Sequence, residues 1–379
     1  MTMRQPFRIS SSFDSGAIEV VAQRDADDLQ VALRADSSAD FRQWFHFRLM
    51  GARGQRVRIR FLNAAQATYV EGWRGYHAVA SYDRETWFRV PTTFEGGELV
   101  IAHEVERDSI YYAYFEPYTW ERHLSLLGRA ESSPRARVRD LGPTVDGRDM
   151  SLVVVGDESG GRKPVWIIAR QHPGETMAEW FVEGMLERLL DVADPVARRI
   201  LERAVLYVVP NMNPDGSVRG NLRTNAAGAN LNREWMTPSA GRSPEVLCVK
   251  EKIHETGVDM FFDIHGDEAL PYNFVAGSEM LADFTPERLA AQNAFIERYM
   301  ASSPDFQNVY GYAASKYNEE LLTLASKYIG HTYKCLSLTL EMPFKDNANL
   351  PDPYVGWNGA RSIALGAAML QPILQSLDD

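Results

Sequence analysis

The spacing of apolar residues differs between the two parts of this chain and constrains its fold more strongly than any other feature. In the first 120 residues, apolar and polar residues alternate in short segments separated by Gly, Asp and Asn. These segments are residues 17–23, 28–36, 44–51, 56–63, 87–94 and 98–105. Because alternation with a period of two is typical of strands that bury one face, the pattern predicts an N-terminal antiparallel β-sandwich domain over residues 1–120.

From about Pro134 the expected strands become apolar on both faces and alternate with helical patterns. The apolar runs are residues 163–171, 204–211 and 258–266, and the helical segments are residues 176–192 and 244–257. Strands buried on both faces and alternating with helices indicate a mixed, largely parallel sheet flanked by helices. We therefore expect an α/β domain over residues 121–379, with the aromatic-rich segment 109–129 as the joint.

One expected strand of the second part runs into His172, Pro173, Gly174 and Glu175, directly before a helix expected to begin near Thr176. Proline and glycine favour a tight turn, so an imidazole and a carboxylate three residues apart can converge at the end of the strand. Taken singly, such a histidine is more often an ordinary polar residue, and a glutamate in a first helical turn is favoured by the helix dipole. The pattern needs a third ligand before it indicates a metal.

His265, at the end of another apolar strand, would supply that third ligand. Two histidines and one glutamate leave a fourth position for water, which distinguishes a catalytic zinc site from a closed structural one. We therefore expect His172, Glu175 and His265 to bind one zinc ion, which lowers the pKa of water and polarises a carbonyl group. Asp263 lies on the same strand face as His265 and could contact it from behind.

Further motifs follow in order along the chain. Residues 210–235 read PNMNPDGSVRGNLRTNAAGANLNREW, and residues 338–341 read LTLE. Together with HPGE and FDIHG, they resemble the zinc carboxypeptidases of the carboxypeptidase A superfamily. The expected β-domain and the phrase YYAYFEPYT are similar to the cytosolic carboxypeptidase branch of that superfamily. The resemblance implies a zinc-dependent metallocarboxypeptidase that removes the C-terminal residue of a peptide or a protein tail.

The resemblance also implies roles for single residues. Arg223 would polarise the scissile carbonyl and stabilise the oxyanion. Asn232 and Arg233 would bind the terminal carboxylate of the substrate, for which a planar guanidinium is well suited. Glu341 would be the general base beside the attacking water. As a catalytic tyrosine we favour Tyr312, with Tyr310 and Tyr317 as competitors.

The chain departs from the family pattern at two places. Asn230 stands where the family usually has an aspartate that orients the first histidine ligand, and an amide oxygen can still accept the His172 ring N–H. The cytosolic branch often reads HGH at the second histidine, whereas Asp267 and Glu268 follow here. That branch often removes acidic residues, chiefly glutamate, through a basic pocket. Lys316 lies in the segment expected to line such a pocket.

Composition limits the partners. The formal net charge is −11, which argues against nucleic acid as a partner. Two cysteines, Cys248 and Cys335, suit reduced structural thiols rather than a disulfide framework. No apolar run is long enough for a transmembrane helix, and the N-terminus lacks the apolar region of a secretory signal. We therefore expect a cytoplasmic protein without a membrane partner.

Two other functions remain compatible with these residues. A zinc deacylase acting on small N-acyl amino acids could use the same ligands, although the Asn232–Arg233 pair and the size of the chain favour a peptidase. A catalytically inactive protein that binds C-terminal tails through its β-domain would not need Glu341. Assays with peptides, with N-acyl amino acids and with added zinc separate these functions.

Overall fold

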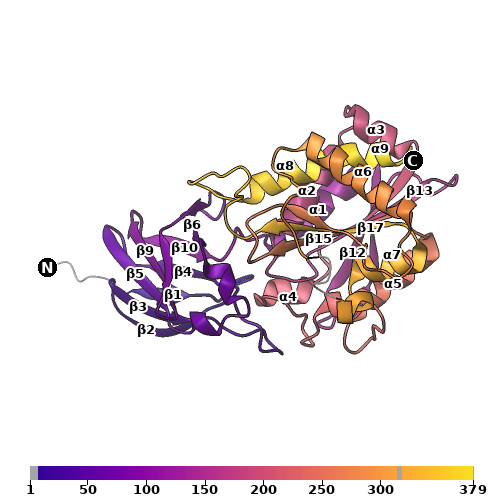
Figure 1. Ribbon diagram of the computed structural model, residues 1–379. Coiled ribbons are helices and arrows are strands. Elements are labelled where there is room, and N and C mark those ends of the chain that lie inside the picture. The colour runs from indigo at the N-terminus through magenta and orange to yellow at the C-terminus, as the bar shows by residue number, and fades with distance from the viewer. Residues whose placement is uncertain (1–6, 314–317, 379) are drawn as a thin grey trace.

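The computed structural model describes residues 7–313 and 318–378. The N-terminal β-domain and the α/β domain lie side by side, with helix α4 (Pro214–Arg219) on the side of the α/β domain that faces the strands of the β-domain (Figure 1). None of the helices in the described part of the chain combines the length and the apolar character that a membrane span requires.

The N-terminal domain is a sandwich of two five-stranded sheets, as predicted. The strand orders are β1-β4-β10-β6-β7 and β2-β3-β5-β9-β8. The strands of the first sheet are β1 (Arg8–Ser10), β4 (His46–Met50), β10 (Ser109–Ala113), β6 (Val79–Ser81) and β7 (Phe88–Arg89). Those of the second are β2 (Glu19–Asp25), β3 (Asp28–Ala32), β5 (Gln55–Phe61), β9 (Glu98–Val105) and β8 (Thr92–Glu95). Neighbouring strands are antiparallel except β3 and β5, which run parallel.

Two details of the sequence-based expectation were wrong. The segment 87–94 forms two strands in different sheets, because Pro91 interrupts it between β7 and β8. The expected joint begins with β10, which pairs with β4 and β6 inside the first sheet. Its aromatic residues therefore belong partly to the core of the sandwich, and only the residues after Ala113 lead to helix α1 (Trp120–Glu131).

The second domain contains a seven-stranded sheet in the order β11-β12-β14-β13-β15-β17-β16. The four central strands β14, β13, β15 and β17 are parallel, and antiparallel strands complete both edges. The bounds are β11 (Ala136–Pro143), β12 (Asp149–Val155), β13 (Lys163–Ala169), β14 (Ala204–Val209), β15 (Met260–Asp267), β16 (Phe274–Ala276) and β17 (Leu336–Pro343). This is the mixed, largely parallel sheet that the apolar runs predict.

Helices cover both faces of this sheet. They are α2 (Met177–Leu190), α3 (Pro195–Leu201), α5 (Pro244–Thr256), α6 (Pro286–Ser302), α7 (Ala325–Tyr333), α8 (Gly359–Ala368) and α9 (Leu370–Ser376). Alternate residues of β13 enter separate apolar clusters, Val165 and Ile167 with α2 and α8, and Trp166 and Ile168 with α5 and α7. The sheet is therefore buried on both sides, as continuous apolar strands require.

Helix α2, which begins directly after the HPGE turn, is held against α8 by a very close approach. A Cβ atom on Gly184 would lie 2.1 Å from the carbonyl oxygen of Ile363, and one on Gly366 would lie 1.9 Å from that of Phe181. Only glycine fits at these two positions. The close packing fixes the helix that follows the expected metal ligands.

The two domains share one apolar core. A single cluster of buried residues extends from the strands of the sandwich to the α2 face of the seven-stranded sheet. At the junction the rings of Tyr114 and Phe344 stack with their centroids 4.6 Å apart. Arg89 of β7 adds polar contacts, since its guanidinium donates to the carbonyl oxygens of Phe344 (3.0 Å), Trp357 (2.8 Å) and Val355 (3.2 Å).

Candidate active site

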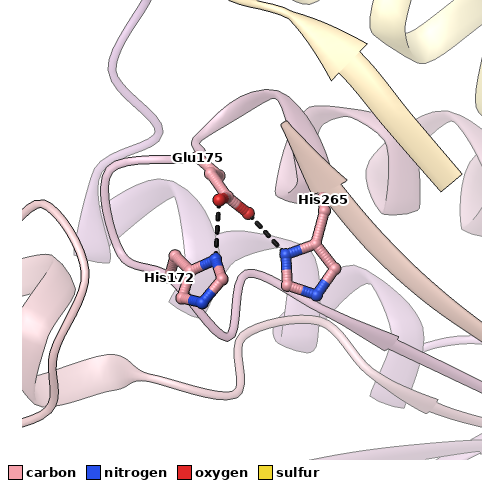
Figure 2. Close-up of side chains that lie close together, drawn as sticks. All are labelled: His172, Glu175 and His265. Carbon is pink, nitrogen blue, oxygen red and sulfur yellow. Dashed lines mark hydrogen bonds and ion pairs between the residues drawn. The ribbon is translucent and has the colours of Figure 1, made fainter. Parts of the chain in front are cut away.

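The three expected metal ligands meet at the carboxyl ends of β13 and β15 (Figure 2). One carboxylate oxygen of Glu175 lies 2.6 Å from Nδ1 of His172, and the other lies 2.7 Å from Nδ1 of His265. One ligand atom from each of the three residues lies within 4.8 Å of the others, and all three side chains are buried. The arrangement presents two imidazole nitrogens and one carboxylate to a single point, which is the donor set of a catalytic zinc site.

The outer ring nitrogens of both histidines are held by polar neighbours. Nε2 of His172 lies 3.1 Å from Oδ1 of Asn230, and Nε2 of His265 lies 2.9 Å from Oδ2 of Asp263. Gln171 donates to the same oxygen of Asp263 at 2.8 Å. Such contacts fix the tautomer of each ring and would leave Nδ1 free to bind a metal. The amide oxygen of Asn230 therefore contacts the ring nitrogen of His172, as its position in the motif led us to expect.

The local backbone is also fixed. Arg170, two residues before His172, has φ of 59°, a conformation that is rare for residues with a side chain. Its buried guanidinium donates to Glu179 of α2 at 2.7 Å and to the carbonyl oxygens of Pro173 and Tyr118, both at 2.9 Å. These contacts hold the turn between β13 and α2 in the shape that brings His172 and Glu175 together.

The electrostatics of the three ligands suit a cation. Burial and the nearby Arg223 lower the pKa of His172 to about 3, so its imidazole is neutral and can bind a metal. Burial also disfavours charge on His265, but Asp263 and Glu175 outweigh it and raise the pKa of that ring. The site therefore stabilises positive charge at the point where the three ligand atoms converge, and the residues fit zinc.

A cavity of about 320 Å³ opens over the metal ligands. Its lining includes all the residues expected to act on substrate that lie in the described part of the chain: Arg223, Asn232, Arg233, Tyr312 and Glu341. A larger depression of about 780 Å³ lies over β11, β12 and α3, and none of the residues expected in the active site lines it. The smaller cavity is the candidate active site because the chemistry converges there.

Glu341 lies on β17 directly beside His265 of β15, since the two residues are Cα partners in the parallel register. The hydroxyl of Tyr312 lies 2.6 Å from Asp267 Oδ2 and 3.1 Å from Glu341 Oε1, so its single proton can be donated to either carboxylate. Asp267 thus contacts the expected catalytic tyrosine, a relation that the sequence did not reveal. The competing Tyr310 is exposed and stacks on Tyr272, and Tyr317 lies outside the described residues.

Asn232 and Arg233 belong to the short 3-10 helix η3 (Leu231–Arg233). The Asn232 side chain lies between the metal site and α7: its Nδ2 is 3.3 Å from His265 Nε2, and its Oδ1 accepts the N–H of Ala325 at 2.8 Å. Arg233 donates to the carbonyl of Asn232 at 2.9 Å. The guanidinium of Arg223 lies over the rings of Tyr69 and Phe41, both from the N-terminal domain.

Two groups of residues in this cavity were not expected from the sequence. Lys327 of α7 is buried and contributes to the lining, whereas the expected Lys316 lies outside the described residues. Tyr69 and Glu71 reach the cavity from the N-terminal domain. A lysine in a helical segment gives no signal of burial, and no local pattern indicates that a sandwich residue will reach a distant site.

Cys248 and Cys335 are both free, as expected.

Comparison with known families agrees with this geometry. Residues 9–115 match the family model described as "Cytosolic carboxypeptidase N-terminal domain", and residues 125–353 match the "Zinc carboxypeptidase" model. Among curated proteins, the chain is 27% identical to mouse cytosolic carboxypeptidase 6, with 88% of this chain and 66% of that protein covered.

Solved structures show the same fold over nearly the whole chain. The metallo-carboxypeptidase from Burkholderia cenocepacia is 61% identical, with a TM-score of 0.96 and coverage of 98% of this chain and 99% of that one. The metallo-carboxypeptidase from Pseudomonas aeruginosa, in complex with (2-guanidinoethylmercapto)succinic acid, is 45% identical, with a TM-score of 0.95 and the same coverage. The chain therefore belongs to the zinc carboxypeptidase family, as a metallo-carboxypeptidase with a cytosolic carboxypeptidase N-terminal domain and a zinc site formed by His172, Glu175 and His265.

Proposed function

We propose that this metallo-carboxypeptidase hydrolyses the last peptide bond of peptides or protein tails and prefers those that end in an acidic residue. Hydrolysis of the last peptide bond is supported by the cavity in which Arg223, Arg233 and Glu341 lie around the zinc ligands. The preference for acidic ends is supported by Lys327, a buried lysine that lines the same cavity. The family's cytosolic branch also supports a cytoplasmic location.

Each residue has a role in the proposed reaction. Asn232 and Arg233 bind the terminal carboxylate, which places the scissile carbonyl beside Glu341. Glu341 accepts a proton from the attacking water and transfers it to the leaving amine. Arg223 donates to the carbonyl oxygen as negative charge develops on it. Zinc, when bound, supplies Lewis acidity that activates water and polarises the carbonyl. Tyr312 lies next to Glu341 and covers the bound substrate.

Lys327 gives the preference for acidic ends its physical basis. Its side chain is buried, and none of the ion pairs among the described residues includes it. Burial lowers its pKa to about 8, and Glu279 acts in the opposite direction, so Lys327 is mostly protonated at neutral pH. A cation in a half-enclosed cavity attracts a side-chain carboxylate more strongly than one in water and repels a basic side chain.

A panel of peptides that differ only at the C-terminus tests the function. We expect release of the terminal residue from free-acid peptides, at least about a hundredfold less from C-terminal amides, and little release from small N-acyl amino acids, measured by mass spectrometry. Equal cleavage of acids and amides would contradict the role of Asn232 and Arg233. Faster cleavage of N-acyl amino acids would favour the deacylase.

Replacing Lys327 by Met tests the preference. In the parent enzyme we expect Glu-ended peptides to have a higher kcat/KM than Leu-ended ones, and the Lys327→Met variant to lose about tenfold or more of this ratio. Hydrolysis of Leu ends should change little, which provides the internal control. Peptides ending in Arg are the informative competitors, because the compound bound to the Pseudomonas relative carries a guanidino group. If Arg ends are cut fastest, the acidic preference is wrong and the carboxypeptidase assignment stands.

A further inference from the structure

The N-terminal domain contacts the catalytic domain at the loop that carries Arg223. The carboxylate of Asp36, between β3 and β4, accepts the backbone N–H groups of three consecutive residues of that loop: Leu222 at 2.6 Å, Arg223 at 3.0 Å and Thr224 at 2.8 Å. The hydroxyl of Thr224 donates a fourth hydrogen bond to it at 2.8 Å. One side chain from the sandwich thus binds the backbone on both sides of Arg223.

These bonds connect groups that are shielded from water. Asp36, Leu222 and Thr224 are all buried. Burial raises the pKa of the Asp36 carboxyl, while its bonds from the three backbone N–H groups act in the opposite direction. A carboxylate offers only acceptors, which matches four converging donors, whereas an amide would direct its own N–H groups at some of them. Replacing the carboxylate by an amide therefore leaves donors unsatisfied in a dry interface.

The opposite side of the same loop contacts the metal-binding turn. The N–H of Gly174, between His172 and Glu175, donates to the carbonyl oxygen of Leu222 at 2.9 Å. A Cβ atom on Gly174 would lie 2.9 Å from that oxygen, so the approach needs glycine. The loop is thus held between the metal-binding turn and Asp36.

The N-terminal domain also provides the surface on which the Arg223 side chain rests. The guanidinium carbon lies 5.8 Å from the ring centroid of Phe41 and 5.5 Å from that of Tyr69. Two aromatic faces stabilise a guanidinium and limit its rotation. Backbone and side chain of Arg223 are therefore both positioned by residues outside the α/β domain.

We propose that Asp36 is a positioning residue for Arg223, so that the N-terminal domain completes the catalytic site of this carboxypeptidase. The inference rests on the proposed role of Arg223 at the carbonyl oxygen. An arginine that acts on the transition state contributes only when its guanidinium is already in place, and a displacement of about 1 Å can cost about a hundredfold in rate. Asp36 fixes that place without touching substrate.

A double-mutant cycle on the full-length zinc enzyme tests the proposal. We expect Asp36→Asn to lower kcat by about a hundredfold and to change KM by less than about threefold, with normal zinc content. In the Arg223→Ala background, Asp36→Asn should lower kcat by less than about threefold, because the residue it positions is gone. Ser38→Ala is the matched control. The Ser38 hydroxyl donates to the carbonyl oxygen of Ala226 and so joins the same two segments, but Ala226 has no functional side chain. This substitution should leave kcat unchanged.

Thr224→Val provides a milder variant in case Asp36→Asn does not fold. It removes one hydrogen bond to Asp36, keeps the shape of the buried side chain and should lower kcat about fivefold, again only when Arg223 is present. Equal losses with and without Arg223, an unchanged kcat in both variants, or a fully active Arg223→Ala enzyme would each overturn the proposal. A parent enzyme that releases no terminal residue from any peptide would instead contradict the proposed function.

Discussion

Replacing Glu341 by Gln is expected to lower kcat by about a thousandfold while leaving zinc binding intact. The substitution keeps the size of the side chain and its place beside His265 on the neighbouring strand, but an amide cannot accept the proton of the attacking water. KM should change little, because the loss concerns the transition state rather than the bound substrate. Single-turnover and steady-state rates on one Glu-ended peptide, with zinc content measured on the same sample, check this.

Glu297→Gln is the matched control for that experiment, since Glu297 is an exposed glutamate on α6. It should retain the parent rate and zinc content. A Glu341→Gln enzyme with more than about a tenth of the parent kcat would show that Glu341 is not the general base. Loss of zinc from that variant would show that Glu341 supports the metal site instead.

Removal of the metal is expected to abolish hydrolysis, and His265→Ala is expected to prevent its return. Dialysis against a chelator should remove about one zinc per chain together with all activity, and added zinc should restore both in the parent enzyme. In His265→Ala two ligands remain, and the carboxylate of Glu175 loses one of its two imidazole contacts. Metal analysis after equilibration at micromolar free zinc measures the binding independently of catalysis.

His254→Ala is the control here, because His254 is exposed on α5 and contributes nothing to the cavity. It should bind zinc and turn over like the parent. Stoichiometric zinc in His265→Ala, or full activity in chelated parent enzyme, would contradict the metal assignment. Zinc should also raise the unfolding temperature of the parent enzyme more than that of His265→Ala, because a ligand that binds only the folded state stabilises it.

The sequence predicted those parts of the site that local geometry determines. His172 and Glu175 flank one turn, so their convergence follows from a proline, a glycine and the start of a helix. His265 was expected because it ends an apolar strand, and Glu341 was expected from the resemblance to the carboxypeptidase family. The structure places the two residues side by side on the parallel strands β15 and β17. The two domains could likewise be predicted, because the spacing of apolar residues within a single segment is enough to distinguish a strand from a helix.

Other parts depend on contacts between distant segments and could not be predicted. The buried Lys327 resembles a surface lysine in sequence, and it becomes buried only because α7 packs against distant strands such as β15 and β17. Asp36 resembles a turn residue after an alternating strand, and its four hydrogen bonds are with residues more than 180 positions away. The aromatic residues of β10 were expected at a joint because they precede a helix, yet sheet pairing with β4 places them in the sandwich.

The shared apolar core determines how this chain loses its structure. Because the stacked rings of Tyr114 and Phe344 belong to one cluster that extends through both domains, separating the domains would expose apolar surface on both of them. Such coupling favours a single cooperative unfolding transition over the stepwise melting of independent modules. A protease that cuts only opened chains would then meet either the whole folded enzyme or a fully open one, and partly folded molecules with an assembled zinc site would be scarce. The N-terminal sandwich would in this way protect the catalytic half from degradation.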